Sequence, residues 1–293
     1  MKGAYTAYII SLILFGLNGV VASYISLPSD EIVFLRTLLG SLTLLAVFLA
    51  LRETFTFLAH RRDFVYVAAS GIAMGASWIF LYEAYQLIGV SISSLAYYCG
   101  PMIVLILAPV LFREKLTWAG TVSFLVVLFG TFLVNGDILL TADNVRGLFC
   151  GAMSAVMHAA MVICTKKVVR MGGLENSLWQ LIFSFLAVAG VMACTGGDFV
   201  FAIAAEDWLP VLILGVFSTG ICCYLYFSSL GHLPVQTVSI CGYLEPLSAV
   251  VFSVLILGEV MLPLQILGAV LILGGAVVGE SIAFRNKKSD SVK

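Results

Sequence analysis

The sequence carries very little charge for its length. Asp, Glu, Lys and Arg make up only 11% of its 293 residues, whereas 61% are hydrophobic and the mean hydropathy is +1.10. A soluble domain has about 25% charged residues, which keep its surface hydrated. The shortage of charge therefore excludes a cytosolic enzyme, a nucleic-acid-binding protein and a secreted disulfide scaffold, and it indicates an integral membrane protein.

Patterns that bind metals or nucleotides are also missing. The 7 Cys contain no CxxC pair, and two of the 3 His, His60 and His232, fall in predicted loops. Zinc sites need closely spaced Cys and His ligands, and a pump driven directly by ATP needs a Walker motif. We therefore expect no metal and no cofactor, and we keep an intramembrane enzyme only as a remote alternative.

Long apolar stretches take up most of the chain. A helix needs about 20 apolar residues to cross a hydrocarbon core about 30 Å thick. By that measure the sequence predicts an all-α integral membrane protein with ten transmembrane helices and short connections. The predicted spans are residues 4–26, 32–51, 65–87, 91–111, 118–134, 146–167, 177–195, 208–230, 235–257 and 262–284.

The basic residues predict an orientation. Lys and Arg concentrate in cytoplasmic loops of membrane proteins. If the N-terminus is cytoplasmic, all of the 15 Lys and Arg except Arg36 and Arg146 fall in cytoplasmic segments. We therefore expect both termini in the cytoplasm. Short connections and the lack of a targeting segment favour a multi-pass protein of a bacterial cytoplasmic (inner) membrane.

The two halves of the chain repeat each other. Each half, residues 1–139 and residues 140–293, holds five predicted spans, so the second half must enter the membrane from the opposite side. Two inverted five-helix repeats allow a site near the midplane to open alternately to either side. The matching residues are Tyr98 with Tyr243, Pro101 with Pro246, Glu114 with Glu259 and Gly130 with Gly275 at a shift of 145, and Gly71 with Gly215 and Tyr82 with Tyr226 at a shift of 144.

These features resemble the EamA-type transporters of the drug/metabolite transporter superfamily over the full length of the chain. The resemblance lies in the five-plus-five layout, in the paired pattern of Pro, twelve residues and Glu, and in the tripeptide Leu244-Glu245-Pro246. It implies that each half is one EamA repeat and that the protein is a secondary active transporter, not an enzyme.

The resemblance leaves the substrate open. We favour a small polar metabolite, an amino acid or related amino compound, moved by alternating access. The alternative is an organic cation such as a choline-like quaternary amine. The expected partners are this small molecule and the lipid bilayer, with no nucleic acid. Proton coupling, the direction of transport and the choice between monomer and homodimer stay open.

Polar residues deep in the predicted spans are candidate substrate ligands. Glu245 and His158 lie near the centres of spans nine and six. A charge there costs about 2.5–3.5 kcal/mol on insertion scales, and such residues often mark a substrate or proton path. Glu245 could hold an ammonium group or a proton that His158 shares; alternatively, both side chains are structural. Asn18 and Gln180 are further polar candidates.

Aromatic residues gather in the spans that should converge. With Glu245 they could form an aromatic, anionic pocket that suits an ammonium group through cation–π contact. The alternative is ordinary helix packing. The candidates are Trp78, Tyr82, Tyr98, Tyr224 and Tyr243.

Two further pairs are candidates for gating. Pro101 and Pro246 lie near the centres of spans four and nine, and each proline removes one helical hydrogen bond, which predicts a kink. Arg36 and Glu83 lie just inside the outer boundary of spans two and three, where they could form an ion pair that acts as an outer gate.

Overall fold

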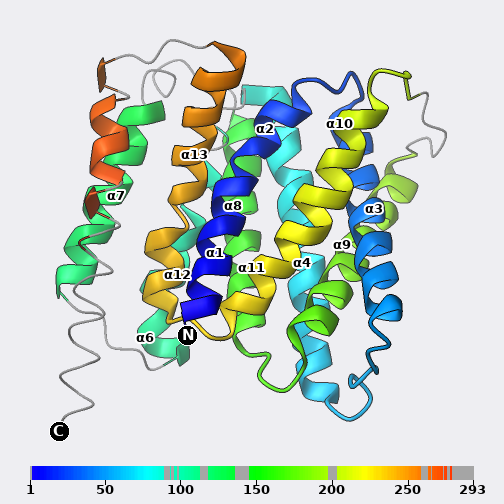
Figure 1. The fold of residues 1–293 in the computed structure, drawn as a ribbon. Helices are drawn as coiled ribbons and strands as arrows, with labels where there is room; N and C mark the ends of the chain where they lie inside the picture. Colours follow the sequence, from blue (N-terminus) through cyan, green and yellow to red (C-terminus); the bar gives the residue numbers. More distant parts are fainter. Residues whose placement is uncertain are drawn as a thin grey trace, which may run out of the picture.

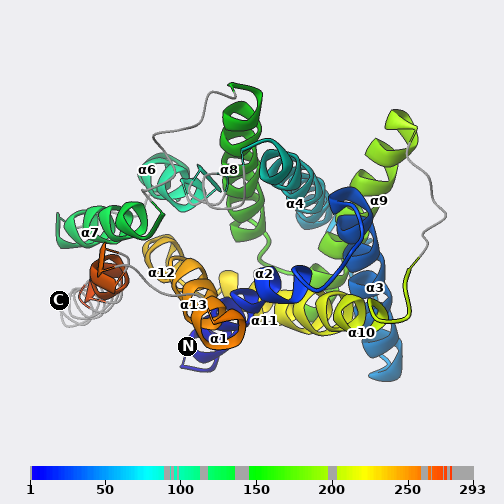
Figure 2. The same ribbon diagram turned by 90° about the horizontal axis from the view of Figure 1, so that it is seen from above.

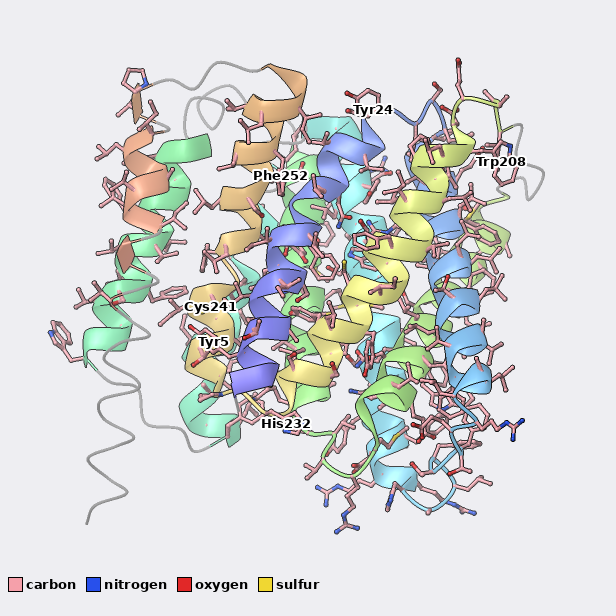
Figure 3. The ribbon with its side chains drawn as sticks, viewed as in Figure 1. Tyr5, Tyr24, Trp208, His232, Cys241 and Phe252 are labelled. Atoms are coloured by element: carbon pink, nitrogen blue, oxygen red, sulfur yellow. The ribbon has the colours of Figure 1, made fainter. Side chains whose placement is uncertain are left out.

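The computed structural model describes residues 2–88, 93, 96–97, 99–112, 118–135, 145–196, 203–258, 263–264, 266–272, 274–275 and 278. Within these residues every regular element is a helix. The long helices run side by side between two ends of the bundle (Figure 1). We name these ends after the residues that mark them in Figure 3: the Trp208 end, which also holds Tyr24, and the His232 end.

The helices follow the predicted spans. Their bounds are α1 Lys2–Phe15, α2 Leu17–Ala22, α3 Ser29–Ala50, α4 Arg61–Ile88, α6 Gly100–Phe112, α7 Trp118–Asn135, α8 Val145–Lys166, α9 Gly173–Thr195, α10 Trp208–Leu212, η2 Ile213–Ile221, α11 Cys222–Leu230, α12 Val235–Cys241, α13 Leu244–Phe252 and η3 Ser253–Leu257. Residues 266–272 and 274–275 are also helical.

Six helical runs in the described part of the chain are long and apolar enough to cross a membrane. They are Gly3–Ala22, Asp30–Ala50, Arg61–Ala84, Val145–Lys166, Gly173–Thr195 and Trp208–Leu230. All six overlap predicted spans, which confirms the helical fold class and an integral membrane protein. The predicted spans at 91–111 and 262–284 lie partly outside the described residues.

Both candidate kink prolines lie where a helix begins. Pro101 is the second residue of α6, and Pro246 is the third residue of α13. The first turn of a helix tolerates proline because its N–H groups have no intrahelical acceptor. The helix is interrupted between α12 and α13. At this interruption the Gly242 carbonyl accepts a 3.3 Å hydrogen bond from Glu245 N. The kink at span nine is thus a full interruption, and the Gly242 carbonyl is not left free.

The packing joins helices from the two halves of the sequence. α4 packs along α8 and α9, α3 packs against α9 and η2, and α1 packs against α11 and α13. Viewed along the bundle, α4 and α8 lie across from α1, α2 and α11 (Figure 2). Every long helix of one half therefore lies against helices of the other half.

Several contacts occur twice, at positions related by the sequence repeat. A Cβ on Gly130 would lie 2.7 Å from the Gly268 carbonyl oxygen and 3.0 Å from Ile272. A Cβ on Gly275 would lie 3.0 Å from the Ser123 carbonyl oxygen and 2.6 Å from Val127. Adding 145 to 130, 123 and 127 gives 275, 268 and 272. Helix α7 thus meets the helical residues 266–272 and 274–275 through two equivalent close contacts.

Candidate functional site

A cavity of about 360 Å³ lies in the middle of the bundle. Its size falls within the range of small-molecule sites, about 300–1,000 Å³. Residues of both halves line it, from α1, α2, α3 and α4 of the first half and from α8, α11 and α13 of the second half. Ser23, at its rim, is exposed, so the cavity opens at the Trp208 end.

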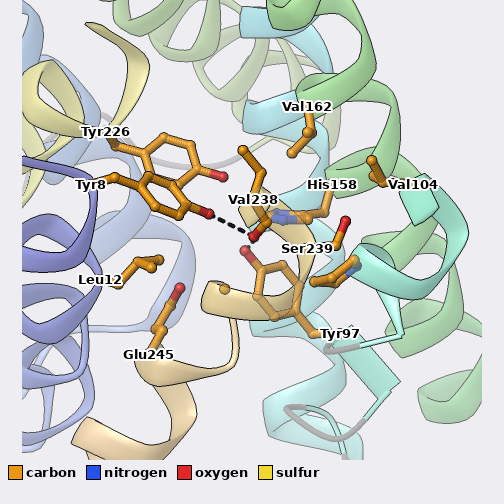
Figure 4. A pocket seen from close by; sticks show the side chains of 12 residues that line it. Tyr8, Leu12, Tyr97, Val104, His158, Val162, Tyr226, Val238, Ser239 and Glu245 are labelled. Atoms are coloured by element: carbon orange, nitrogen blue, oxygen red, sulfur yellow. Dashed lines mark hydrogen bonds between the residues drawn. The ribbon is translucent and has the colours of Figure 1, made fainter. Parts of the chain in front are cut away.

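The deep end of the cavity is polar and aromatic. There Glu245 points toward the rings of Tyr8 and Tyr226, with His158 and Tyr97 across from them (Figure 4). The Tyr97 hydroxyl lies 2.7 Å from His158 Nδ1, and the Tyr8 hydroxyl donates a 2.9 Å hydrogen bond to the Val238 carbonyl. A small pocket of about 20 Å³ between these side chains has room for about one water.

Arg36 lies in the wall of the same cavity. Its side chain is held on three sides: Nε donates a 3.1 Å hydrogen bond to Thr219 Oγ1, Nη1 lies 3.4 Å from the Tyr82 hydroxyl, and Cζ lies 4.3 Å from the Trp78 ring centroid. The residue is only 4% exposed. Arg36 is therefore a buried, firmly positioned cation that faces the cavity.

The π-helix η2 positions the acceptor for Arg36. Thr219 donates its hydroxyl proton to the Leu214 carbonyl five residues earlier, at 2.8 Å. π-helical segments are rare and often occur at functional sites. The close approach of α3 to η2 also depends on Gly40, because a Cβ there would lie 2.8 Å from Thr219 Cγ2.

Most of the predicted ligands lie together in this cavity. Five of the candidate substrate ligands line it, and Pro101 lines the small pocket at its deep end. The Oδ1 atom of Asn18 is buried, with no hydrogen-bond partner among the described residues. These five ligands are Glu245, His158, Trp78, Tyr82 and Asn18.

Three predicted ligands lie elsewhere. Tyr243 is fully buried against Phe124 of α7, with ring centroids 5.7 Å apart. Gln180 is fully buried in a hydrogen-bond network at the His232 side of the cavity. Tyr224 packs against the main core, because residues two apart on a helix face different directions and Tyr226 takes the cavity side. Tyr98 lies outside the described residues.

The expected ion pair between Arg36 and Glu83 does not form. Glu83 Oε1 instead accepts a 2.7 Å hydrogen bond from Nη2 of Arg146, whose side chain is 74% exposed. The reason is the packing of α4 along α8, which brings the start of α8 beside the last turns of α4. Arg36 therefore makes no salt bridge with Glu83 and lines the cavity.

Four residues of the site are not among the ligands predicted from the sequence. Tyr8, Tyr97, Tyr226 and Thr219 either line the cavity or hold a residue that does. The repeat contained a signal for one of them, because Tyr226 matches Tyr82 at a shift of 144. Nothing in the sequence distinguishes Tyr8 from other aromatic residues of the first span.

A buried hydrogen-bond network around Gln180 closes the bundle on the His232 side of the cavity. Gln180 Oε1 accepts hydrogen bonds from Ser70 Oγ at 2.5 Å and from Thr165 Oγ1 at 3.1 Å, and Gln180 Nε2 donates to Asn176 Oδ1 at 3.0 Å. All four residues are buried. Helices α4, α8 and α9 are therefore joined tightly below the cavity.

Carboxylates hold the loops of the His232 end across the two halves. Asp63 Oδ2 accepts hydrogen bonds from the backbone N–H groups of Val169 at 2.9 Å and Arg170 at 2.7 Å. Glu175 accepts three more from Thr56 and Phe57. At the Trp208 end, Asp207 accepts a longer bond of 3.3 Å from Ser26 N.

Comparison with known proteins agrees with this architecture. The model of the EamA-like transporter family matches residues 1–136 and 145–278. The uncharacterized transporter YxxF of Bacillus subtilis is 28% identical over 276 residues, which are 91% of this chain and 86% of YxxF. The pseudopaline exporter CntI of Pseudomonas aeruginosa is 26% identical over 66% of each chain.

A solved crystal structure shares the fold. It covers 94% of this chain and 98% of its own, with a TM-score of 0.79 and 19% sequence identity. The names of the family and of the similar proteins indicate a transporter rather than an enzyme. Because the family model matches both halves of the sequence, this chain belongs to the EamA-like transporter family.

Proposed function

We propose that this protein is a secondary active transporter that moves an amino acid or related amino compound by alternating access between two inverted five-helix repeats. The observation that carries the proposal is the central cavity. Both halves of the chain line it, it opens at the Trp208 end, and it contains the half-buried carboxylate of Glu245. A transporter of this kind needs such a site between its repeats.

Contacts related by the repeat support the inverted arrangement. The contacts of Gly130 and Gly275 exchange under a shift of 145 residues. A shift of 144 takes Asp63 to Asp207 and Ser26 to Arg170, so the two loop contacts made by these carboxylates are also equivalent. Asp63 lies at the His232 end and Asp207 at the Trp208 end, as expected if the two repeats run in opposite directions.

The difference between the two ends supports alternating access. At the His232 end, Asp63 accepts two short hydrogen bonds and the Gln180 network is buried. The equivalent contact at the Trp208 end is one longer bond, beside the open rim of the cavity. Two states in which these roles exchange would expose the site to each side in turn.

The charges of the loops favour an orientation. Arg61, Arg62, Lys167 and Arg170 line one surface pocket at the His232 end. Because basic loops are cytoplasmic, we place this end and both termini in the cytoplasm of a bacterial cell. In this orientation, the cavity faces the outside.

The substrate class follows from the chemistry of the cavity. The Glu245 carboxylate can pair with an ammonium group, and the Asn18 Oδ1 acceptor can receive one of its N–H donors. The rings of Trp78, Tyr82 and Tyr226 keep a choline-like amine as the alternative, because aromatic faces attract such cations. The pseudopaline exporter and YxxF are similar to this chain, and their names leave its substrate to experiment.

Uptake by proteoliposomes tests the proposal. We expect vesicles preloaded with unlabelled L-leucine, L-methionine or L-phenylalanine to accumulate the same labelled amino acid by exchange. Glu245→Gln should lower the exchange rate at least about tenfold, because it removes the cavity charge that pairs with the substrate. The matched control is Glu83→Gln, since Glu83 pairs with the exposed Arg146 outside the cavity.

The outcomes separate the two candidate substrates. Exchange of labelled choline without exchange of any amino acid would favour the alternative. Wild-type vesicles that exchange neither would contradict the proposal, as would equal loss in the Glu245→Gln and Glu83→Gln proteins.

A further inference from the structure

We propose that Arg36 binds the carboxylate of the substrate while Glu245 binds its ammonium group, so that the cavity selects a zwitterion over an organic cation. This inference rests on the proposed transport function. It gives Arg36 a role in substrate binding in place of the predicted outer gate.

The first step is the charge of Arg36, which makes no salt bridge within the described residues. Arg36 is 4% exposed, and the ion pair recorded within the described residues is that of Arg146 with Glu83. A guanidinium always carries its charge and has five N–H donors. Thr219 and Tyr82 accept two of them. Glu245 lines the same cavity but makes no salt bridge with Arg36, so the unused N–H donors of Arg36 can bind the anionic group of a substrate.

The second step is geometric. Trp78 lies against the guanidinium at 4.3 Å, and Thr219 holds Nε, so that the side chain has one fixed orientation. A guanidinium fixed in this way can bind a carboxylate through two parallel hydrogen bonds. The hydroxyl of Thr219 is itself anchored to the Leu214 carbonyl in η2. Contacts within the protein therefore orient the guanidinium without any substrate.

The third step concerns the competing substrate. A quaternary amine would use the face of an aromatic ring. The guanidinium of Arg36 already lies over Trp78. An organic cation would therefore meet like charge at this wall, whereas a carboxylate would meet opposite charge. Arg36 thus acts against a purely cationic ligand and in favour of an anionic group.

The fourth step joins the two charges. Arg36 and Glu245 line the same cavity, and they come from α3 in the first half and α13 in the second half. Glu245 makes no ion pair among the residues that the structure describes. Apolar wall is supplied by Phe15, Met74, Met161 and Phe227. An amino acid with an apolar side chain can pair with both charges and pack its side chain against this apolar wall.

Ligands that differ in one charge test the inference. The probes are L-leucine, L-methionine and L-phenylalanine, their amides, which lack the carboxylate, their N-acetyl derivatives, which lack the ammonium group, and choline. Kd is measured by calorimetry on the detergent-purified full chain. We expect wild type to bind an amino acid at least about tenfold more tightly than its amide or its N-acetyl derivative.

Variants of Arg36 and of a control arginine show whether the Arg36 charge itself selects the ligand. Arg36→Gln should weaken amino-acid binding at least about tenfold and should bind the amide more tightly than wild type does, because the repelling charge is gone. A merely damaged site would lose both ligands. Arg146→Gln, which changes an exposed arginine, should leave every Kd unchanged. Should Arg36→Gln fail to fold, Thr219→Val removes the Nε acceptor and should reduce the preference for the amino acid over the amide.

The possible failures are distinguishable. If the amides or choline bind wild type as tightly as the amino acids do, the role of Arg36 is overturned and the transport proposal stands. The same holds if Arg36→Gln and Arg146→Gln behave alike. If none of the probes binds wild type, the proposed substrate class fails, and the inference fails with it.

Discussion

At the residue scale, His158 connects the two halves of the chain beside the cavity. Its Nδ1 lies 2.7 Å from the Tyr97 hydroxyl, and the two rings meet edge to face with centroids 4.8 Å apart. Gly100 leaves room for this arrangement, because a Cβ there would lie 2.9 Å from His158 Cδ2. The contact therefore joins α8 to the segment before α6 in the wall of the cavity.

Removal of one hydroxyl should reveal the value of this contact. We expect Tyr97→Phe to lower stability by about 1 kcal/mol, the typical net worth of one hydrogen bond. Thermal unfolding in detergent should shift down by about 2–4 °C per kcal/mol in a chain of this size. Tyr24→Phe is the control, because Tyr24 is exposed. Equal unfolding temperatures for the two variants would refute the contribution of the contact.

At the element scale, helix breaks shape the cavity. α1 and α2 are separated at Gly16, which faces α13. A Cβ on Gly16 would clash with Ser248 Oγ and would lie 2.6 Å from the backbone nitrogen of Ala249. α12 and α13 are separated just before Glu245. Two interrupted helices, one from each half, therefore meet at the wall of the site.

A single methyl group should disturb this meeting point. Gly16→Ala is expected to destabilise the protein by about 1–3 kcal/mol, because backbone atoms must move to accept the new carbon. Gly3→Ala is the matched control in the same membrane span, since a Cβ there has nothing within 4 Å. The check is the unfolding temperature of each variant with and without amino acid. A Gly16→Ala protein as stable as Gly3→Ala would show that the close approach is unimportant.

Helix positions could be predicted from the sequence more fully than the faces of the helices. Apolar runs of about 20 residues identify spans by themselves, so the helices from α1 to α13 fall where the sequence predicted them. A side chain's direction depends on the neighbouring helix, which composition does not reveal. The sequence therefore predicts Tyr224 as a ligand, whereas Tyr226 faces the cavity. It also predicts that Glu83 pairs with Arg36, whereas Glu83 pairs with Arg146 of α8.

At the scale of the whole molecule, Asp63 and Asp207 are equivalent contacts at opposite ends. Asp63 accepts two bonds of 2.9 and 2.7 Å, whereas Asp207 accepts one of 3.3 Å. If the two repeats exchange conformations during transport, the short bonds should form at Asp207 and the long bond at Asp63. Asp63 then stabilises the state in which the cavity opens at the Trp208 end, and Asp207 stabilises the opposite state.

Substitution of each aspartate should shift that balance in opposite directions. The reporter is Ser23→Cys at the rim of the cavity, in a background without the 7 native cysteines, labelled with a membrane-impermeant maleimide. Asp63→Ala should slow labelling by about tenfold, because hydrogen bonds to a charged group contribute about 1.5–3 kcal/mol each. Asp207→Ala should leave labelling as fast or faster. A change of the same sign in both would contradict the exchange.

The interruption before α13 has an electrostatic consequence. α13 begins at Leu244, so Glu245 lies in its first turn. The peptide dipoles of a helix place a partial positive charge at its N-terminus, which stabilises a nearby anion by about 0.3–2 kcal/mol. The backbone of α13 itself therefore supports the negative charge of Glu245 inside the apolar bundle.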